Sequence, residues 1–243
     1  MTPELLKISD HLTEELNGLE FEEPITHVYR PLVYARSLHR TYVEKFGVET
    51  PREAILIGMN PGPWGMGQTG VPFGDVDFVR DWMGIDGEVG KPDHEHPKRP
   101  VEGLECHRNE VSGSRLWGWA EERFGPAENF FERFFVYNYC PLLFLEESGR
   151  NLPPSRMKVA QRRKLTPPCD QALREAVAYL DPDYVIGVGN YARDRIKKAF
   201  EDEPKVDFTI GRILHPSPAS PKANQGWAEQ AEEQLHELGI DVD

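Results

Sequence analysis

The chain has 243 residues and a formal net charge of −13, and 39% of its residues are hydrophobic. This length suits one large domain or two small ones, and the hydrophobic fraction is enough to build a core. No stretch approaches the roughly 18 consecutive apolar residues of a membrane span, and the charged N-terminal segment lacks the apolar region of a secretion signal. We therefore expect a cytoplasmic protein, nucleoid-associated or nuclear according to its source, with no membrane partner.

In the first half of the chain, the hydrophobic pattern predicts a helix over 3–20, a strand over 53–59, a helix over 77–85, a long loop over 86–113 and a helix over 114–124. A strand over 133–139 and a basic segment with prolines over 141–168 follow. The pattern then predicts a helix over 170–180, a strand over 184–189, a helix over 191–201, a strand over 206–214 and a helix over 224–238. Strands that alternate with helices indicate a three-layer α/β/α fold around a mostly parallel four-stranded sheet. No repeat or linker divides the chain, so we predict a single α/β domain over residues 1–243.

Cysteine content and local charge restrict the chemistry further. Cys106, Cys140 and Cys169 are three irregularly spaced cysteines, too few for the usual iron–sulfur ligand set and odd in number for a disulfide framework. The acidic excess disfavours nucleic-acid binding in general. Residues 149–164 are the exception, with six basic and no acidic side chains. This segment is either a solvated basic loop or a phosphate-binding surface.

Polar residues follow the four predicted strands. In open α/β sheets, ligands bind beyond the carboxyl ends of the strands. Asn60, Asn138, Asn190 and His215 stand at these ends, and we expect Asn190 to cap the next helix. No acidic residue stands directly at any of them, so carboxylate acid–base catalysis is not favoured. Amides suit the recognition of a planar heterocycle, and a histidine can donate a hydrogen bond to charge that builds on a leaving group.

The first of these strands runs into an unusually long loop. Residues 59–75 contain five glycines and three prolines, mixed with large side chains. Ordinary connections need about two to six residues. Glycine-rich backbone allows close approach to a ligand and offers N–H donors, so the loop is predicted to wrap a bound group.

Several stretches resemble the single-strand-selective monofunctional uracil-DNA glycosylase family, a branch of the uracil-DNA glycosylase superfamily. The most specific are GMNPGPWGMGQTGVPFG at 58–74 and HPSPASPKAN at 215–224, and the segments 95–106, 110–118 and 136–142 are similar to the family as well. The resemblance is collinear over about residues 20–240 and implies the superfamily's fold. It implies a monomeric base-excision-repair enzyme without cofactor or metal, which hydrolyses the N-glycosidic bond of uracil, and also of 5-hydroxymethyluracil, in single- and double-stranded DNA.

The resemblance also implies roles for individual residues. Asn60 matches the residue that positions the attacking water, and His215 matches the histidine that hydrogen-bonds the departing base. Phe73 matches the aromatic that stacks on the flipped base, and Asn138 the amide that recognises the uracil edge. The remaining matches line the pocket (Met59, Gly62, Met66) or belong to the loop that enters DNA (Ser217, Pro218, Ala219, Ser220, Lys222). Such roles fit an enzyme that must extrude its base before it can act on the sugar.

Three departures from the family pattern bear on DNA binding. Trp64 stands where the family has Phe, and Gly67 where it has Ala; both changes should be tolerable near the pocket rim. Ala219 stands where a larger, often basic, residue inserts into DNA, and a small residue is a poor wedge. We expect weak, salt-dependent DNA binding through residues 149–164 and Lys222, with Arg115 as a further candidate, and flipping that depends on neighbouring residues or on single-stranded substrate.

Four alternatives stay open on the sequence alone. A glycosylase for deaminated purines such as hypoxanthine or xanthine, and a catalytically silent DNA-binding relative, share the same motifs. GVGNYA at 187–192, with Asp207 downstream, fits a weak dinucleotide-binding pattern. A zinc site could use His94, His96, Cys106 and His107.

Overall fold

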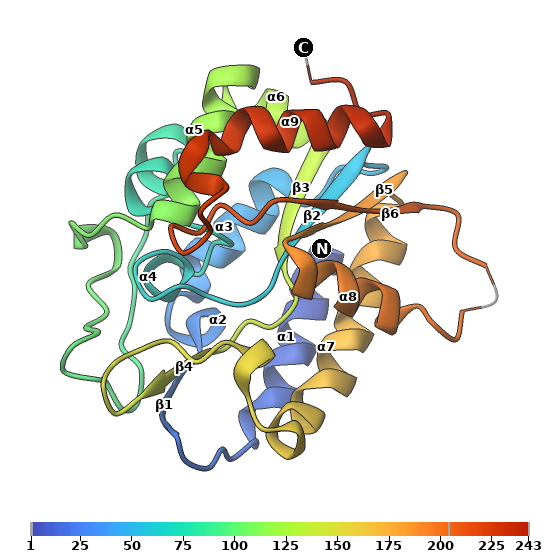
Figure 1. The fold of residues 1–243 in the computed structure, drawn as a ribbon. Coiled ribbons are helices and arrows are strands. Elements are labelled where there is room, and N and C mark those ends of the chain that lie inside the picture. The colour runs from blue at the N-terminus through green and yellow to red at the C-terminus, as the bar shows by residue number, and fades with distance from the viewer. Residues whose placement is uncertain (1, 204, 243) are drawn as a thin grey trace.

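The computed structural model describes residues 2–203 and 205–242, and a four-stranded parallel sheet lies at its centre (Figure 1). The strand order is β3-β2-β5-β6, built from β2 (Ala54–Gly58), β3 (Phe134–Asn138), β5 (Tyr184–Val188) and β6 (Thr209–Ile213). Every residue of the inner strand β2 and of the edge strand β3 is buried, as expected for a parallel sheet covered on both faces. The four strands predicted from the sequence are therefore confirmed, in one parallel sheet.

Two glycines show that helices cover both faces of this sheet. A Cβ atom on Gly187 of β5 would lie 2.2 Å from the backbone nitrogen of Arg193 in α8 (Asn190–Ala199). A Cβ on Gly211 of β6 would lie 2.4 Å from Leu238 in α9 (Trp227–Leu238). Gly211 pairs with the residue before Gly187, and successive strand residues face opposite sides. The two helices thus lie on opposite faces, which confirms the three-layer α/β/α class.

The other long helices join these two layers. α1 (Glu4–Asn17) packs against α7 (Val159–Leu180), which in turn contacts α8. α5 (Val111–Phe124) contacts both α6 (Ala127–Arg133) and α9, and Figure 1 shows these three helices together at one end of the molecule. Aromatic rings fill the core between these elements. Phe46, at the end of α3 (Arg36–Phe46), stacks on Phe131 with ring centroids 4.0 Å apart.

Several elements of the structure were not predicted from the sequence. They are the helices α2 (Pro31–Tyr34), α3, α4 (Met66–Thr69) and α6, and the antiparallel pair formed by β1 (Ile25–Tyr29) and β4 (Leu143–Glu146). α2, α4 and α6 are too short for a clear periodicity, whereas α3 buries Leu38, Tyr42 and Phe46 at a spacing of four and carries a helical pattern that the prediction overlooked. β1 and β4 are far apart in the chain, so only the tertiary fold pairs them. The helix predicted over 77–85 is a single π-helical turn, Phe78–Trp82. Three short 3₁₀ turns complete the described elements, at Gly103–Glu105, Pro154–Arg156 and Ala223–Gln225.

The basic segment differs most from its prediction. The helix expected over 170–180 begins at Val159 and forms α7, which includes Pro167 and Pro168. Each proline removes a backbone donor, which is why the sequence pattern ended there. Burial of Leu165 and Leu173 against the core holds the helix together across this weak point.

No helix among the described residues is long and apolar enough to cross a membrane. Cys106, Cys140 and Cys169 are buried as free thiols.

Candidate active site

A pocket of about 340 Å³ opens at the carboxyl ends of the parallel strands. Nine of the residues predicted for the site line it: Met59, Asn60, Gly62, Met66, Phe73, Asn138, His215, Ser217 and Ala219. Pro218 and Lys222 belong to the same loop as Ala219 but are exposed outside the pocket, and Ser220 is half-buried. The tertiary fold therefore gathers at one place residues that come from the ends of β2, β3 and β6.

Asn60 is oriented by backbone carbonyls. Its Nδ2 lies 3.3 Å from the carbonyl oxygen of Leu142 and 3.4 Å from that of Pro61. An amide nitrogen can only donate, so these contacts fix which end of the amide is which. The Oδ1 atom is then the end that can accept a hydrogen bond from a water molecule in the pocket.

Asn138 presents a polar edge inside the pocket. The side chain is only 6% exposed, its Nδ2 lies 3.0 Å from the sulfur of Met66, and its Oδ1 is buried without a hydrogen-bond partner among the described residues. A buried acceptor left unpaired costs about 1–3 kcal/mol. Sulfur is a weak acceptor. The amide is thus prepared for a ligand that offers one good donor and one good acceptor side by side.

Gly58 allows the amide and the aromatic wall of the pocket to meet. A Cβ atom at this position would lie 2.0 Å from Oδ1 of Asn138 and 2.7 Å from Cε2 of Phe73. Any side chain at position 58 would therefore displace both groups. The last residue of β2 is a glycine because the pocket is built directly on its backbone.

Phe73 is held in an unusual backbone conformation. Its φ is +53°, which is uncommon for a residue with a side chain and costs roughly 1–3 kcal/mol. The Phe73 carbonyl accepts hydrogen bonds from Nε1 of Trp117 at 3.1 Å and from the backbone N–H of Asp75 at 2.7 Å, which fix this conformation. The ring is half-buried, lines the pocket and lies 6.1 Å from the His215 ring, centroid to centroid.

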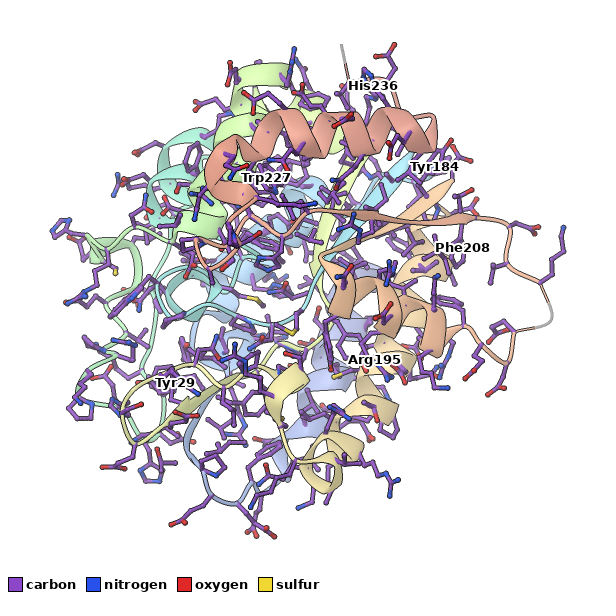
Figure 2. The ribbon with its side chains drawn as sticks, viewed as in Figure 1. Tyr29, Tyr184, Arg195, Phe208, Trp227 and His236 are labelled. Carbon is purple, nitrogen blue, oxygen red and sulfur yellow. The ribbon has the colours of Figure 1, made fainter. Side chains whose placement is uncertain are left out.

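His215 is a neutral hydrogen-bond donor at physiological pH. Its Nδ1 accepts the backbone N–H of Ser217 at 3.0 Å, so the proton of the neutral ring lies on Nε2. Burial lowers the pKa of His215 to about 4. The strand end that carries it is anchored by Nε1 of Trp227, the residue labelled at the start of α9 in Figure 2, which donates to the Leu214 carbonyl at 2.6 Å.

The structure adds one acidic residue that sequence reasoning missed. The carboxyl group of Glu110 lines the pocket, and its Oε2 is buried without a hydrogen-bond partner among the described residues. Burial raises the pKa of Glu110, and the N–H groups of Trp64 and Gly65 oppose this shift. A Cβ on Gly62 would lie 2.3 Å from Oε2, so Gly62 makes room for this carboxyl. Glu110 was missed because the sequence argument considered residues that follow strands, whereas Glu110 precedes α5. The signal that could have found it is the segment 110–118, which resembles the family and begins with Glu110.

The loop 216–224 is held from one side by Arg115. Its Nη1 donates to the Pro216 carbonyl at 3.0 Å and its Nη2 to Oδ1 of Asn224 at 2.9 Å. The two hydrogen bonds use two of the five N–H donors of the guanidinium group, so a DNA contact of Arg115 stays a prediction. Ala219 and Lys222 remain exposed on it.

Three other interpretations of the sequence do not match the structure. Asn190 is the first residue of α8 and is exposed, while the cap position is Gly189, so its predicted capping role is wrong. Asp207 precedes β6, at the end opposite the pocket, and forms an ion pair with Lys205 at 2.6 Å, which does not suit a ribose ligand. Within residues 2–203 and 205–242, no three His, Cys, Asp or Glu side chains are grouped to hold a metal, and the suggested zinc ligands are not gathered.

Comparisons with known proteins agree with this geometry. A model of the uracil DNA glycosylase superfamily matches residues 45–236, which places the sheet and its pocket in this class of proteins. The crystal structure of wild-type SMUG2 from Pedobacter heparinus has the same fold, with a TM-score of 0.67 at 18% identity, over 96% of this chain and 97% of that chain.

Closer relatives identify the branch. Single-strand-selective monofunctional uracil-DNA glycosylases of Rattus norvegicus and Bos taurus are 49% and 48% identical to this chain over 230 residues. The match covers 94% of this chain and 82% and 84% of the respective relatives. The chain belongs to the single-strand-selective monofunctional uracil-DNA glycosylase family.

Proposed function

We propose that this protein removes uracil from DNA by hydrolysing the N-glycosidic bond of a flipped nucleotide, as a step of base excision repair. The observation that carries the proposal is the convergence of a carbonyl-anchored Asn60, a buried Asn138 with an unpaired oxygen and a neutral His215 around one pocket. Family membership supports the same reaction.

Recognition follows from the amide of Asn138. Uracil offers a donor at N3 beside an acceptor at O4, which pairs with the Oδ1 and Nδ2 atoms of one amide. Cytosine reverses this pattern at its edge and would leave Oδ1 facing another acceptor. Phe73 provides the flat surface on which an extruded base stacks.

The chemical step needs a placed water and a sink for negative charge. The bond from C1′ to N1 breaks with its electron pair on the base, while the water held by Asn60 forms the new C–O bond. The proton that the water loses neutralises the uracil anion, so the products are uracil and an abasic sugar. The Nε2–H of His215 donates to the charge that develops on the base, and one such donor contributes about 3 kcal/mol to the transition state. Asn60 contributes by positioning its water, because an amide does not act as a base.

DNA binding depends on exposed residues around the pocket. Arg156 lines the pocket mouth from the 3₁₀ turn Pro154–Arg156, and Lys222 extends from the loop 216–224. Ala219 stands at the rim, where its small side chain cannot fill the space that a base leaves in a duplex. We infer that the protein acts as a monomer, prefers single-stranded substrate, and also accepts 5-hydroxymethyluracil.

The test is incubation of the purified protein with oligonucleotides that carry one uracil, single-stranded or paired with G or A, followed by alkaline cleavage of abasic sites. Asn60→Ala should retain binding and lose cleavage by about 10²-fold or more. Absence of cleavage on all three substrates at low salt would overturn the proposal. Cleavage confined to hypoxanthine or xanthine oligonucleotides would show the purine alternative instead.

A further inference from the structure

A tryptophan with two arginines over its ring stands beside the pocket. The Cζ atom of Arg108 lies 4.5 Å from the ring centroid of Trp64, and that of Arg99 lies 5.2 Å from it. Both distances fall within the range of cation–π attraction. A guanidinium group stacked in this way keeps its N–H donors available at its edge. We call Trp64, Arg99 and Arg108 the arginine–tryptophan cluster.

Gln68 fixes the position of this cluster. Its side chain is buried, and its Nε2 donates to the carbonyls of Pro63 at 2.9 Å and Pro100 at 3.0 Å. Its Oε1 accepts two backbone N–H groups from the chain that follows Pro100. Trp64 follows Pro63 and Arg99 precedes Pro100, so one buried amide holds the two segments side by side.

Arg108, the third member of the cluster, is positioned through Glu110 and Asp75 and not through Gln68. The backbone N–H of Glu110, two residues after Arg108, donates to Oδ2 of the buried Asp75 at 2.8 Å. The backbone N–H of Trp64 in turn lies against the carboxyl of Glu110, which lines the pocket. The cluster therefore adjoins the pocket wall and is attached to it by hydrogen bonds.

The two guanidinium groups are not neutralised by carboxylates. Neither Arg99 nor Arg108 forms an ion pair with any residue in the described ranges, whereas Arg36 and Arg40 each pair with a carboxylate. Nη1 of Arg99 donates to the neighbouring Lys98 carbonyl at 2.8 Å and its Nε is buried, so Nη2 is the nitrogen of Arg99 that we expect to reach a ligand. Glu95, on the same loop, is paired with Lys91 at 3.5 Å. In a chain with a net charge of −13, two stacked and unpaired cations beside the pocket indicate an anionic ligand.

We propose that the arginine–tryptophan cluster binds a phosphate of the DNA strand that carries the flipped nucleotide, next to the nucleotide whose base enters the pocket. This inference rests on the proposed function. Guanidinium groups bind phosphate oxygens through paired N–H donors. Stacking on Trp64 restricts both side chains before DNA arrives, which lowers the entropy cost of binding. On a single strand, which no complementary strand holds straight, such a fixed contact orients the nucleotide toward the pocket.

The binding test uses a single-stranded oligonucleotide with one uncleavable 2′-fluoro analogue of deoxyuridine. The double variant Arg99→Ala/Arg108→Ala should weaken binding about tenfold at low salt and reduce the slope of log K against log salt by about 0.7, the value for one lost phosphate contact on a single strand. Each single variant should have a smaller effect, because the other arginine still contacts the phosphate. Arg40→Ala, which removes an exposed arginine paired with Glu44, is the matched control and should change neither quantity.

A second measurement begins with the wild-type protein, so its first result does not depend on the folding of a variant. Neutral methylphosphonate linkages, placed one at a time beside the analogue, should weaken wild-type binding at one particular linkage. That linkage should have no further effect in the double variant Arg99→Ala/Arg108→Ala, because the same contact is already lost. Binding and salt slopes equal to those of Arg40→Ala, with no sensitive linkage, would overturn the cluster proposal. Uracil excision by the wild type, assayed on the matching deoxyuridine oligonucleotide, reports separately on the proposed function.

Discussion

The pocket and its exposed rim, formed by Ala219, Lys222 and Arg156, are built in opposite ways. In the pocket, Asn60, Phe73 and His215 are each held by backbone hydrogen bonds. Around it, Ala219, Lys222 and Arg156 are exposed, and no ion pair fixes either basic side chain among the described residues. Chemistry requires atoms placed to within fractions of an ångström, whereas attraction to phosphates requires only charge at the right distance. Substitutions in the pocket should therefore change the rate, and substitutions around it should change affinity.

The largest effect is expected for Gly58→Ala. The new Cβ would displace both the amide of Asn138 and the ring of Phe73, so uracil excision should fall by about 10² to 10³-fold. Single-turnover rates with excess enzyme measure this loss. Gly18→Ala is the matched control, because nothing lies within 4 Å of its added Cβ. Normal excision by Gly58→Ala would show that the pocket is not built on the β2 backbone as described.

His215→Ala should reduce the rate about 10²-fold, which corresponds to the loss of about 3 kcal/mol of charge stabilisation. The wild-type rate should not change from pH 8 to about 5.5, because burial holds the pKa of His215 at about 4 and the ring stays neutral there. As the pH approaches 4, the ring gains a proton on Nδ1 and can no longer accept the hydrogen bond from the Ser217 N–H that holds it in place, so the rate should fall.

Two variants complete this comparison. His236→Ala removes an exposed histidine on α9 (labelled in Figure 2) and should leave the rate unchanged. Glu110→Gln removes the other titratable group of the pocket, so any inflection that it abolishes belongs to that carboxyl. An inflection near pH 6.5 that persists in Glu110→Gln and disappears in His215→Ala would contradict a buried, neutral imidazole.

A second buried histidine, outside the pocket wall, should control acid stability. His39 contacts the Gly70 carbonyl and Oγ of Ser9, and burial lowers its pKa to about 4. The unfolded chain has the ordinary histidine pKa near 6.5, so it binds more protons between these values. Stability should therefore fall as the pH drops from about 6.5 to 4, by up to about 3 kcal/mol for this one group. Urea unfolding at several pH values measures the fall, and His39→Gln should flatten it.

The smallest effect is expected at the rim. Ala219→Arg should increase excision from double-stranded uracil DNA by several-fold, since a larger basic residue can fill the gap in the duplex and attract phosphates. Excision from single strands should change less. Val48→Arg adds the same charge at a remote exposed position and serves as the control. Equal gains on both substrates would indicate that charge alone, and not filling of the gap, was limiting.

The sequence alone determined the four parallel strands, the α/β/α class and the strand-end residues of the pocket. Short continuous apolar runs and specific motifs are local properties, and parallel strands place their carboxyl ends at one edge. It could not determine the β1–β4 pair, the extension of α7 through Pro167 and Pro168, or the supporting role of Arg115. Each of these depends on partners distant in the chain.

The tertiary structure alone decided which polar atoms face the pocket. The Nδ1 contact of His215, the unpaired oxygen of Asn138 and the carboxyl of Glu110 follow from burial and from neighbours that no spacing reveals. The arginine–tryptophan cluster likewise depends on buried Gln68 and Asp75, which hold together segments that are distant in the chain. Motifs define which groups are available, and packing defines their protonation, orientation and partners, because these depend on desolvation and on distances between segments remote in sequence.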